Sequence, residues 1–204
     1  MSRELQEQFG NIDIYLFDQL LKGNITKDMT ILDAGCGMGR NLRYLLQSGY
    51  NVYALDRSEE AIQHVQRLGE KLAPEWSSEQ ARVESLESLS FADASFDFVI
   101  SSAVLHFAED EVHFDQMVQE LWRVLKPGGR LFARLASSIG IEDLVKPLGH
   151  QRYILPDGST RFLVDEDQLM RIATALHGDL FEPIKTTIVA GQRCMTTWCV
   201  RKGT

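Results

Sequence analysis

The residues best suited to chemistry lie in one short segment, residues 31–41. Three glycines, Gly35, Gly37 and Gly39, follow an apolar run and precede a helical stretch. Glycine lets the backbone turn tightly and approach a ligand without a Cβ in the way. Asp33 stands just before these glycines, where a carboxylate would repel a pyrophosphate placed on the following helix N-terminus. We therefore expect this loop to bind a ligand that carries a cationic amine and no phosphate.

A second carboxylate, Asp56, ends the next apolar segment, residues 51–56. In an open α/β sheet, an acid in this place accepts hydrogen bonds from the two hydroxyls of a ribose. The alternative is that Asp56 only starts the turn before Ser58, which is a good helix N-cap. We favour the ribose interpretation because the glycine loop and the acid occur together at the spacing of a βαβ unit.

Alternating strand and helix patterns must position these residues. Strands are predicted at 29–34, 51–56, 81–84, 96–101 and 129–135, with helices between them and a β-hairpin at 183–190 and 194–201. Strands that alternate with helices imply a parallel sheet with helices on both faces. The predicted fold class is α/β: a doubly wound, mostly parallel, Rossmann-like sheet whose C-terminal hairpin gives one antiparallel strand.

We predict one domain over residues 1–204. Within it, residues 1–28 form an N-terminal helical cap with a helix near 12–21, and residues 29–135 form the ligand-binding core. Residues 136–164 are rich in proline and glycine and are expected to form an irregular insertion that covers a substrate. Asp165 and Gln168 resemble a capping box that opens the next helix.

Composition narrows the function classes. The chain has 204 residues and a formal net charge of −8, which disfavours a nucleic-acid partner. It contains no apolar run long enough to span a membrane, and its N-terminus lacks the apolar core of a secretory signal. The three cysteines show no metal-ligand spacing. We expect a cytoplasmic protein without a metal or a membrane partner, present as a monomer or a homodimer.

Four motifs in order resemble those of class I S-adenosylmethionine-dependent methyltransferases. They are residues 31–39 (ILDAGCGMG), 54–56 (ALD), 95–100 (SFDFVI) and 121–131 (LWRVLKPGGRL). The resemblance covers residues 30–135, about half of the chain. Residues 39–41, with Tyr44-Leu45 and Gly49-Tyr50, are also similar to tellurite-resistance methyltransferases.

The resemblance implies S-adenosylmethionine as cofactor and S-adenosylhomocysteine as product. It assigns the methionine and ribose parts to Asp33, Ala34, Gly35, Cys36 and Gly37, the ribose hydroxyls to Asp56, the adenine flank to Arg57, and the sulfonium end to Ser101 and Ser102. Ser85 stands where the family often has an acid for the adenine amino group. Glu84 or Glu87 could replace that acid, or the backbone near Leu86 could contact the ring instead.

Methyl transfer from a sulfonium is an in-line displacement in which alignment of the reactants supplies roughly 7–11 kcal/mol of the barrier. A general base adds about 10²–10⁴-fold where the acceptor must lose a proton. His106 follows the fourth predicted strand and is the candidate base. The alternative is a histidine that is only hydrogen-bonded at the start of a loop.

Residues outside the core must recognise the acceptor. Arg134, Arg152, Arg161 and Arg193 suggest a small anionic acceptor, because guanidinium forks match carboxylate and oxyanion geometry; scattered surface arginines are the alternative. Tyr15 could wall the site or simply pack. Two other functions stay open: a non-catalytic adenosylmethionine-binding module and a nicotinamide-dependent oxidoreductase. The loop spacing Gly-x-Gly-x-Gly and Asp33 disfavour the oxidoreductase.

Overall fold

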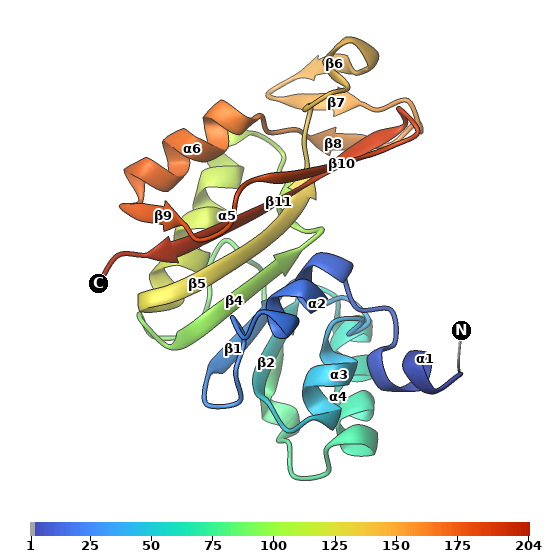
Figure 1. The fold of residues 1–204 in the computed structure, drawn as a ribbon, viewed down its shortest axis with the longest axis vertical. Coiled ribbons are helices and arrows are strands. Elements are labelled where there is room, and N and C mark those ends of the chain that lie inside the picture. The colour runs from blue at the N-terminus through green and yellow to red at the C-terminus, as the bar shows by residue number, and fades with distance from the viewer. Residues whose placement is uncertain (1–2) are drawn as a thin grey trace.

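A computed structural model describes residues 3–204 and places an eight-stranded sheet at the centre of the molecule (Figure 1). The strand order is β10-β11-β5-β4-β1-β2-β3, and β9 pairs with β11. The strands are β1 (Thr30–Ala34), β2 (Asn51–Asp56), β3 (Ala81–Val83), β4 (Phe96–Ser102), β5 (Leu125–Ala136), β9 (Gly178–Leu180), β10 (Lys185–Val189) and β11 (Arg193–Lys202). This order places β1 and β4 side by side in the middle of the sheet.

Strand directions confirm the predicted fold class. Strands β3, β2, β1, β4 and β5 pair in parallel, and β11 is antiparallel to β5. Because β9 and β10 are each antiparallel to β11, β11 alone runs against the other strands of this sheet in the described part of the chain. The hairpin therefore adds the one antiparallel strand that the sequence predicts.

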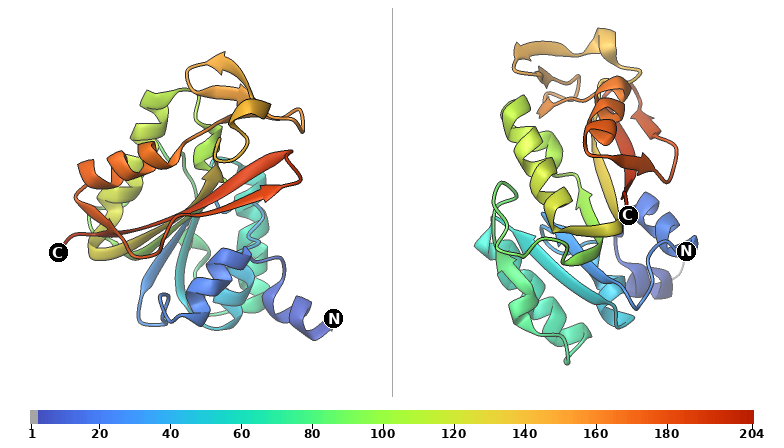
Figure 2. Two further views of the ribbon diagram at one scale, coloured as in Figure 1. Left: turned by 45° about the horizontal axis from the view of Figure 1, so that its top comes forward. Right: turned by 90° about the vertical axis from the view of Figure 1, so that its left-hand side faces the viewer.

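Helices cover both faces of the sheet (Figure 2). One face carries α2 (Ile14–Leu21), α3 (Leu42–Gln47) and α4 (Glu59–Leu72), and the other carries α5 (Glu111–Val124) and α6 (Glu166–Ala175). Short 3-10 helices lie at Ser78–Gln80, Leu105–Phe107 and Glu142–Leu144. Among residues 3–204, no helix combines the length and the apolar character that crossing a membrane requires.

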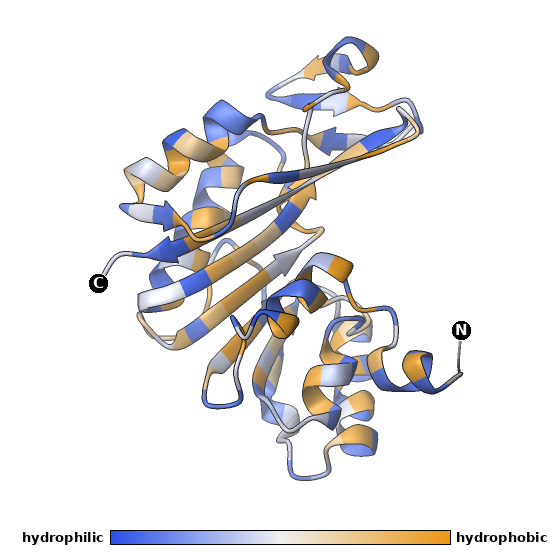
Figure 3. Ribbon diagram, viewed as in Figure 1, coloured by the Kyte–Doolittle hydropathy of each residue, from blue (hydrophilic) through white to orange (hydrophobic). Residues whose placement is uncertain are grey.

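Alternation along the central strands builds two hydrophobic cores. Ile31, Phe98 and Ile100 pack with α2, α3 and α4, whereas Leu32 and Val99 pack with α5 and α6. Successive strand side chains point to opposite faces of a sheet, so strands buried on both faces are apolar at nearly every position. Figure 3 shows hydrophobic colour along the middle of β4 and of β5, interrupted by hydrophilic positions.

The segment that the sequence predicts to be irregular is ordered instead. It forms a three-stranded antiparallel sheet from β6 (Lys146–Gly149), β7 (Arg152–Ile154) and β8 (Thr160–Phe162), at the top of Figure 1. The prolines and glycines that suggested irregularity belong to its strands and turns: Gly158 has a φ of +82°, and the Asp157 carboxylate accepts a hydrogen bond from Ser159 N. We call residues 137–164 the cap.

The N-terminal segment holds two helices where the sequence predicts one. Helix α1 (Arg3–Phe9) ends at Gly10, whose φ is +60°, and α2 follows with Asp13 as its N-cap. Phe9 packs against Phe17 and Tyr44, which joins α1 to α2 and α3. Positions 1 and 2 of the predicted N-terminal cap lie outside the described residues.

Strand β5 begins earlier than the sequence predicts. It starts at Leu125 rather than at Gly129, directly after α5, and Phe96 of β4 pairs with Leu125. Pro127, Gly128 and Gly129 therefore lie inside the strand, opposite an irregularity of the β4–β5 ladder. Proline and glycine are tolerated in a strand at such irregular positions.

Candidate functional site

A first cavity of about 440 Å³ opens at the carboxyl ends of the parallel strands. Its wall comes from the loops after β1, β2, β3 and β4, and from His113 and Met117 of α5. In open α/β sheets, ligands bind outside the carboxyl ends of the strands where the connections leave toward opposite faces. The topology therefore places this cavity at the end of β1, where the sequence predicts a binding site.

Two glycines after β1 shape this cavity in different ways. Gly35 has a φ of +81°, and a Cβ built on it would lie 2.4 Å from Val104 Cγ2. Gly37 has a φ of +51°, and apart from Gly37 and its two chain neighbours no described residue has an atom within 4 Å of a Cβ built there. Gly35 thus permits close packing against the loop after β4, whereas Gly37 leaves room for a ligand.

Asp56 lines the first cavity and holds the glycine loop. Its Oδ2 accepts a hydrogen bond of 2.9 Å from Gly37 N, and its Oδ1 accepts one of 2.9 Å from Ser58 N. Because each carboxylate oxygen has two acceptor sites, ligand hydroxyls can bind to the same carboxylate. Asp56 therefore starts the turn and also faces the cavity, so both interpretations of this acid are compatible with its geometry.

Asp33 is a buried carboxylate without a hydrogen-bond partner. It is 1% exposed, and neither of its oxygens has a partner within residues 3–204. Burial raises the pKa of Asp33 to about 7, although the nearby positive charge of Arg40 opposes this increase. A buried carboxyl without a partner is costly, so a cationic group of a ligand would stabilise it here.

Arg40 connects the glycine loop to β4, and no sequence pattern marked it as a site residue. Its Nη2 donates a hydrogen bond of 2.8 Å to Ser102 Oγ and lies 3.5 Å from Asp13 Oδ2. Arg40 lines the first cavity beside Asp56 and Ser102. It is therefore a positive charge that can meet the carboxylate of a ligand.

The loop between β3 and β4 forms the outer wall of the first cavity through residues 84–87. Glu109 N donates to His113 Nδ1, so the ring proton lies on Nε2 and is shared with Glu87 Oε1 at 2.5 Å. Ser85 also contacts Glu87. Polar groups therefore join α5 to this loop at the rim of the cavity.

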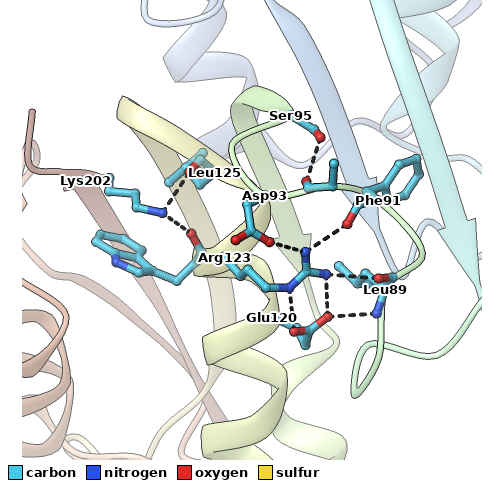
Figure 4. A network of polar contacts seen from close by, with 10 residues as sticks. Leu89, Phe91, Asp93, Ser95, Glu120, Arg123, Leu125 and Lys202 are labelled. Atoms are coloured by element: carbon cyan, nitrogen blue, oxygen red, sulfur yellow. Dashed lines mark hydrogen bonds and ion pairs between the residues drawn. The ribbon is translucent and has the colours of Figure 1, made fainter.

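Arg123 of α5 holds the rest of the same loop (Figure 4). Its guanidinium donates to Leu89 O at 2.9 Å and to Phe91 O at 2.8 Å, and it forms ion pairs with Asp93 and Glu120. Glu120 also accepts a hydrogen bond of 2.8 Å from Leu89 N. The wall of the first cavity is thereby attached to a helix of the core.

A second cavity of about 350 Å³ adjoins the first. Arg40, Ala103 and Phe107 line both cavities. The remaining wall of the second cavity comes from His106 in the 3-10 helix after β4, from the end of β5, from the cap and from the β10–β11 hairpin. Its charged residues are Arg134, Asp157, Arg161 and Arg193. Two connected spaces thus meet at the carboxyl ends of β1 and β4.

His106 lies in the wall of the second cavity and is 5% exposed. Its Nδ1 accepts a hydrogen bond of 3.1 Å from Ala136 N. Burial, and then the charge of Arg161, lower the pKa of His106 to about 3. The ring is therefore neutral with its proton on Nε2, which favours a hydrogen-bond donor; the role of general base stays a prediction.

Most of the predicted site residues meet at these cavities. The predicted cofactor residues that line the first cavity are Gly35, Cys36, Gly37, Asp56, Arg57, Leu86 and Ser102, and Glu84, Ser85 and Glu87 line it beside Leu86. Asp33, Ala34 and Ser101 are buried beneath its wall, and Ser102 rather than Ser101 reaches the surface of the cavity. Strand alternation accounts for this, because neighbouring residues of β4 face opposite ways.

The predicted acceptor residues divide into two groups. Arg134, Arg161 and Arg193 line the second cavity, whereas Arg152 of β7 and Tyr15 of α2 line neither cavity. The Tyr15 hydroxyl contacts Thr187 Oγ1 at 2.6 Å, and the Arg134 guanidinium lies 5.3 Å from the Tyr15 ring centroid. Tyr15 therefore contacts the Arg134 guanidinium through its ring and does not line the cavity.

Val104, His113 and Met117 also line the first cavity, and the sequence pattern gave no signal for them because they lie on a loop and a helix far from the glycine motif.

Among the residues that the structure describes, no group of three or more His, Cys, Asp or Glu side chains is placed to hold a metal ion.

Comparison with known proteins places this geometry in context. The model of the methyltransferase domain family matches residues 32–133, which is half of the chain. "Uncharacterized methyltransferase YodH" of Bacillus subtilis is 35% identical over 127 residues, which cover 62% of this chain and 48% of that protein. The chain spans about half or less of the length of the curated relatives it matches.

Solved structures share the fold. A SAM-dependent methyltransferase from Methanosarcina mazei superposes with a TM-score of 0.72 at 24% identity and covers 90% of this chain and 97% of that one. The 1,6-didemethyltoxoflavin-N1-methyltransferase of Burkholderia thailandensis, solved with S-adenosylhomocysteine, has a TM-score of 0.68 at 20% identity and covers 99% and 82%. At these identities the similarity shows the fold alone.

Proposed function

Because the chain belongs to the methyltransferase domain family, we propose that it is an enzyme that transfers a methyl group from S-adenosylmethionine to a small molecule and releases S-adenosylhomocysteine. The observation that carries the proposal is the buried carboxylate of Asp33, which has no partner among the described residues and lies next to the glycine loop. A second carboxylate, Asp56, accepts a hydrogen bond from Gly37 N in the same loop. This pair suits an aminoacyl nucleoside, because one carboxylate can meet an ammonium and the other can accept from ribose hydroxyls.

The residues present fit such a cofactor in the first cavity. Asp33 and Arg40, which are close enough for the Arg40 charge to act on the Asp33 pKa, would hold the ammonium and the carboxylate of its amino-acid end. Asp56 would hold the ribose. Arg57 and the backbone at Leu86 would flank the adenine, since both line the same cavity.

When bound, the cofactor supplies a methyl group on a positively charged sulfur, which is an activated leaving group. The protein then has to align the acceptor and exclude water, and such alignment is worth roughly 7–11 kcal/mol. Ala103 and Phe107, which line both cavities, would form the apolar boundary across which the transfer takes place. We propose that His106 donates a hydrogen bond to the acceptor from Nε2.

The second cavity is the proposed acceptor site. Its volume of about 350 Å³ suits a small molecule rather than a segment of a protein or nucleic-acid substrate. Four arginines and one aspartate line it in a chain of net charge −8. This local excess of positive charge supports an anionic acceptor, with Arg134, Arg161 and Arg193 as candidate contacts and neither Arg152 nor Tyr15 in direct contact.

Turnover with a defined set of acceptors tests the proposal. The purified protein would be incubated with S-adenosylmethionine and small thiols, amines, carboxylates and metalloid oxyanions, and S-adenosylhomocysteine would be measured. Formation of this product with one acceptor class supports an enzyme. Cofactor binding without turnover for any class would favour a non-catalytic binding module instead.

We propose a cytoplasmic location. The described cysteines, Cys36, Cys194 and Cys199, are all free and buried, which suits a reducing compartment. We also propose that the protein acts without a nucleic-acid partner, as a monomer or a homodimer, and analytical ultracentrifugation distinguishes these two states.

A further inference from the structure

The arginines of the second cavity differ in whether they form an ion pair with a carboxylate of the protein. Asp13 is 4% exposed, and its Oδ2 lies 3.0 Å from Arg134 Nη1 and 3.5 Å from Arg40 Nη2. Arg40 also belongs to the proposed cofactor site. These two guanidinium groups are therefore engaged before any acceptor binds.

Arg161 and Arg193 have no such partner. Arg161 of β8 donates from Nη1 to its neighbour Thr160 O at 2.7 Å, and its guanidinium lies 4.9 Å from the centroid of the Phe107 ring. Within residues 3–204, Arg161 forms no ion pair, and Arg193 forms neither an ion pair nor a hydrogen bond through its side chain. Two cations thus face the second cavity without an ion pair to a carboxylate of the described residues.

Asp157 does not neutralise them at contact distance. Its Oδ1 accepts from Ser159 N at 2.9 Å and from Ser159 Oγ at 2.6 Å. Hydrogen bonds from Ser159 lower the pKa of Asp157, and the charges of Arg193 and Arg161 lower it further. All three charged side chains therefore share one region, and its net charge is positive.

Apolar side chains complete this wall. Leu155 of the cap, which is 4% exposed, and Phe107, Val189 and Met195 line the same cavity. Paired guanidinium groups suit a carboxylate, and the surrounding apolar surface suits an organic body rather than a fully hydrated inorganic ion.

We infer that the methyl acceptor is an organic carboxylate, anchored by Arg161 and Arg193 with its carbon skeleton against Leu155 and Met195. This inference rests on the proposed function, because it treats the second cavity as the acceptor site. The methyltransferase family model matches residues 32–133, and both arginines lie outside this range. The cap and the hairpin, not the shared core, would then select the charge of the acceptor.

Binding to the protein saturated with S-adenosylhomocysteine tests this inference. The probes are benzoate, 4-hydroxybenzoate, succinate and malonate, each compared with its neutral amide, and inorganic phosphate serves as the oxyanion probe. Dissociation constants come from chemical-shift titrations of ¹⁵N-labelled protein. Arg161→Gln and Arg193→Gln are compared with Arg152→Gln, a cap arginine that lines neither cavity.

We expect at least one carboxylate to bind at least tenfold more tightly than its amide and than phosphate. Arg161→Gln and Arg193→Gln should each weaken that binding at least tenfold, Arg152→Gln less than twofold, and none should change S-adenosylhomocysteine affinity more than twofold. No preference for a carboxylate, equal effects of all three substitutions, or stronger binding of phosphate would overturn the inference. Failure of S-adenosylhomocysteine itself to bind would instead contradict the proposed function.

Discussion

Asp56 and Gly37 are joined by a hydrogen bond of 2.9 Å from Gly37 N to Asp56 Oδ2. The bond connects the end of β2 to the turn after β1, and both residues line the first cavity. One carboxylate therefore shapes the loop and presents its remaining acceptor sites to the ligand. This dual use ties the conformation of the glycine loop to the proposed recognition of the ribose.

Replacing Asp56 with alanine should weaken S-adenosylhomocysteine binding about 10–100-fold, because hydrogen bonds to a charged group contribute about 1.5–3 kcal/mol. Isothermal titration calorimetry measures the effect. Asp179→Ala, at an exposed acid of β9 away from both cavities, is the matched control and should leave the affinity unchanged. Equal affinity in the two variants would contradict the role assigned to Asp56.

Asp33 should make the stability of the free protein depend on pH. Its folded pKa is raised to about 7 from an ordinary value of 3.8, so the folded state keeps a proton that the unfolded state releases. The Asp33 contribution to the free energy of unfolding should therefore fall as pH rises from about 4 to 7, by up to roughly 4 kcal/mol. Asp33→Asn should lack this dependence.

Urea denaturation of the wild type and Asp33→Asn at pH 5 and pH 8 checks the sign. The stability difference should shift in favour of the variant at the higher pH. Affinity for S-adenosylhomocysteine, by contrast, should increase with pH through 7 in the wild type, because ionised Asp33 attracts the ammonium. Parallel pH profiles of stability for the two proteins would show that Asp33 is not the titrating group.

Gly35→Ala should cost more stability than a comparable change elsewhere. Gly49 also has a positive φ, of +71°, but a Cβ there meets no described residue beyond its chain neighbours within 4 Å, whereas at Gly35 it meets Val104. Gly49→Ala should therefore cost only the backbone strain, and Gly35→Ala about 1–3 kcal/mol more from overpacking. Denaturation curves compare them.

Val104→Ala in the Gly35→Ala background supplies the control. Removing the Val104 methyl groups clears the atoms nearest to the new Cβ, so the double variant should regain much of the additional loss. If the second substitution only adds its own cost, the contact with Val104 is not the reason that residue 35 must be glycine.

His106→Gln should lower turnover at least tenfold for an accepted substrate while S-adenosylhomocysteine affinity stays within twofold. His106 lines the second cavity, the proposed acceptor site, so its loss should affect turnover. It does not line the first cavity, the proposed cofactor site, so the affinity for S-adenosylhomocysteine should be unchanged. With a pKa near 3, His106 should contribute no ionisation to the rate profile between pH 5 and 8. Unchanged turnover in the variant would remove His106 from the reaction.

The core of the fold was predictable from local sequence. Each central strand is a short apolar run, and Asp33, Asp56 and the glycines stand at strand ends, so the topology alone brings them together. The helices after Ser58 and Asp165 begin where their N-caps predict, because the Ser58 and Asp165 side chains accept from Ala61 N and Gln168 N.

The structure around the second cavity was harder to predict, because it depends on contacts between residues that are distant in sequence. Asp13 meets Arg134 across 121 positions of the chain, and no local pattern encodes that pair. In the cap, a high content of proline and glycine is compatible with an irregular loop and also with the turns of a small antiparallel sheet. Composition alone therefore does not distinguish the two structures. His150 and Gln151, with positive φ values between β6 and β7, carry no glycine signal.

Calorimetric titration with S-adenosylhomocysteine and, separately, with NADH tests the central claim most directly. The first cavity should take up one S-adenosylhomocysteine per chain, with a dissociation constant that Asp56→Ala raises, and NADH should give no saturable heat. Saturable NADH binding, or no binding of S-adenosylhomocysteine by a folded wild-type protein, would contradict the assignment of this cavity to an adenosylmethionine cofactor.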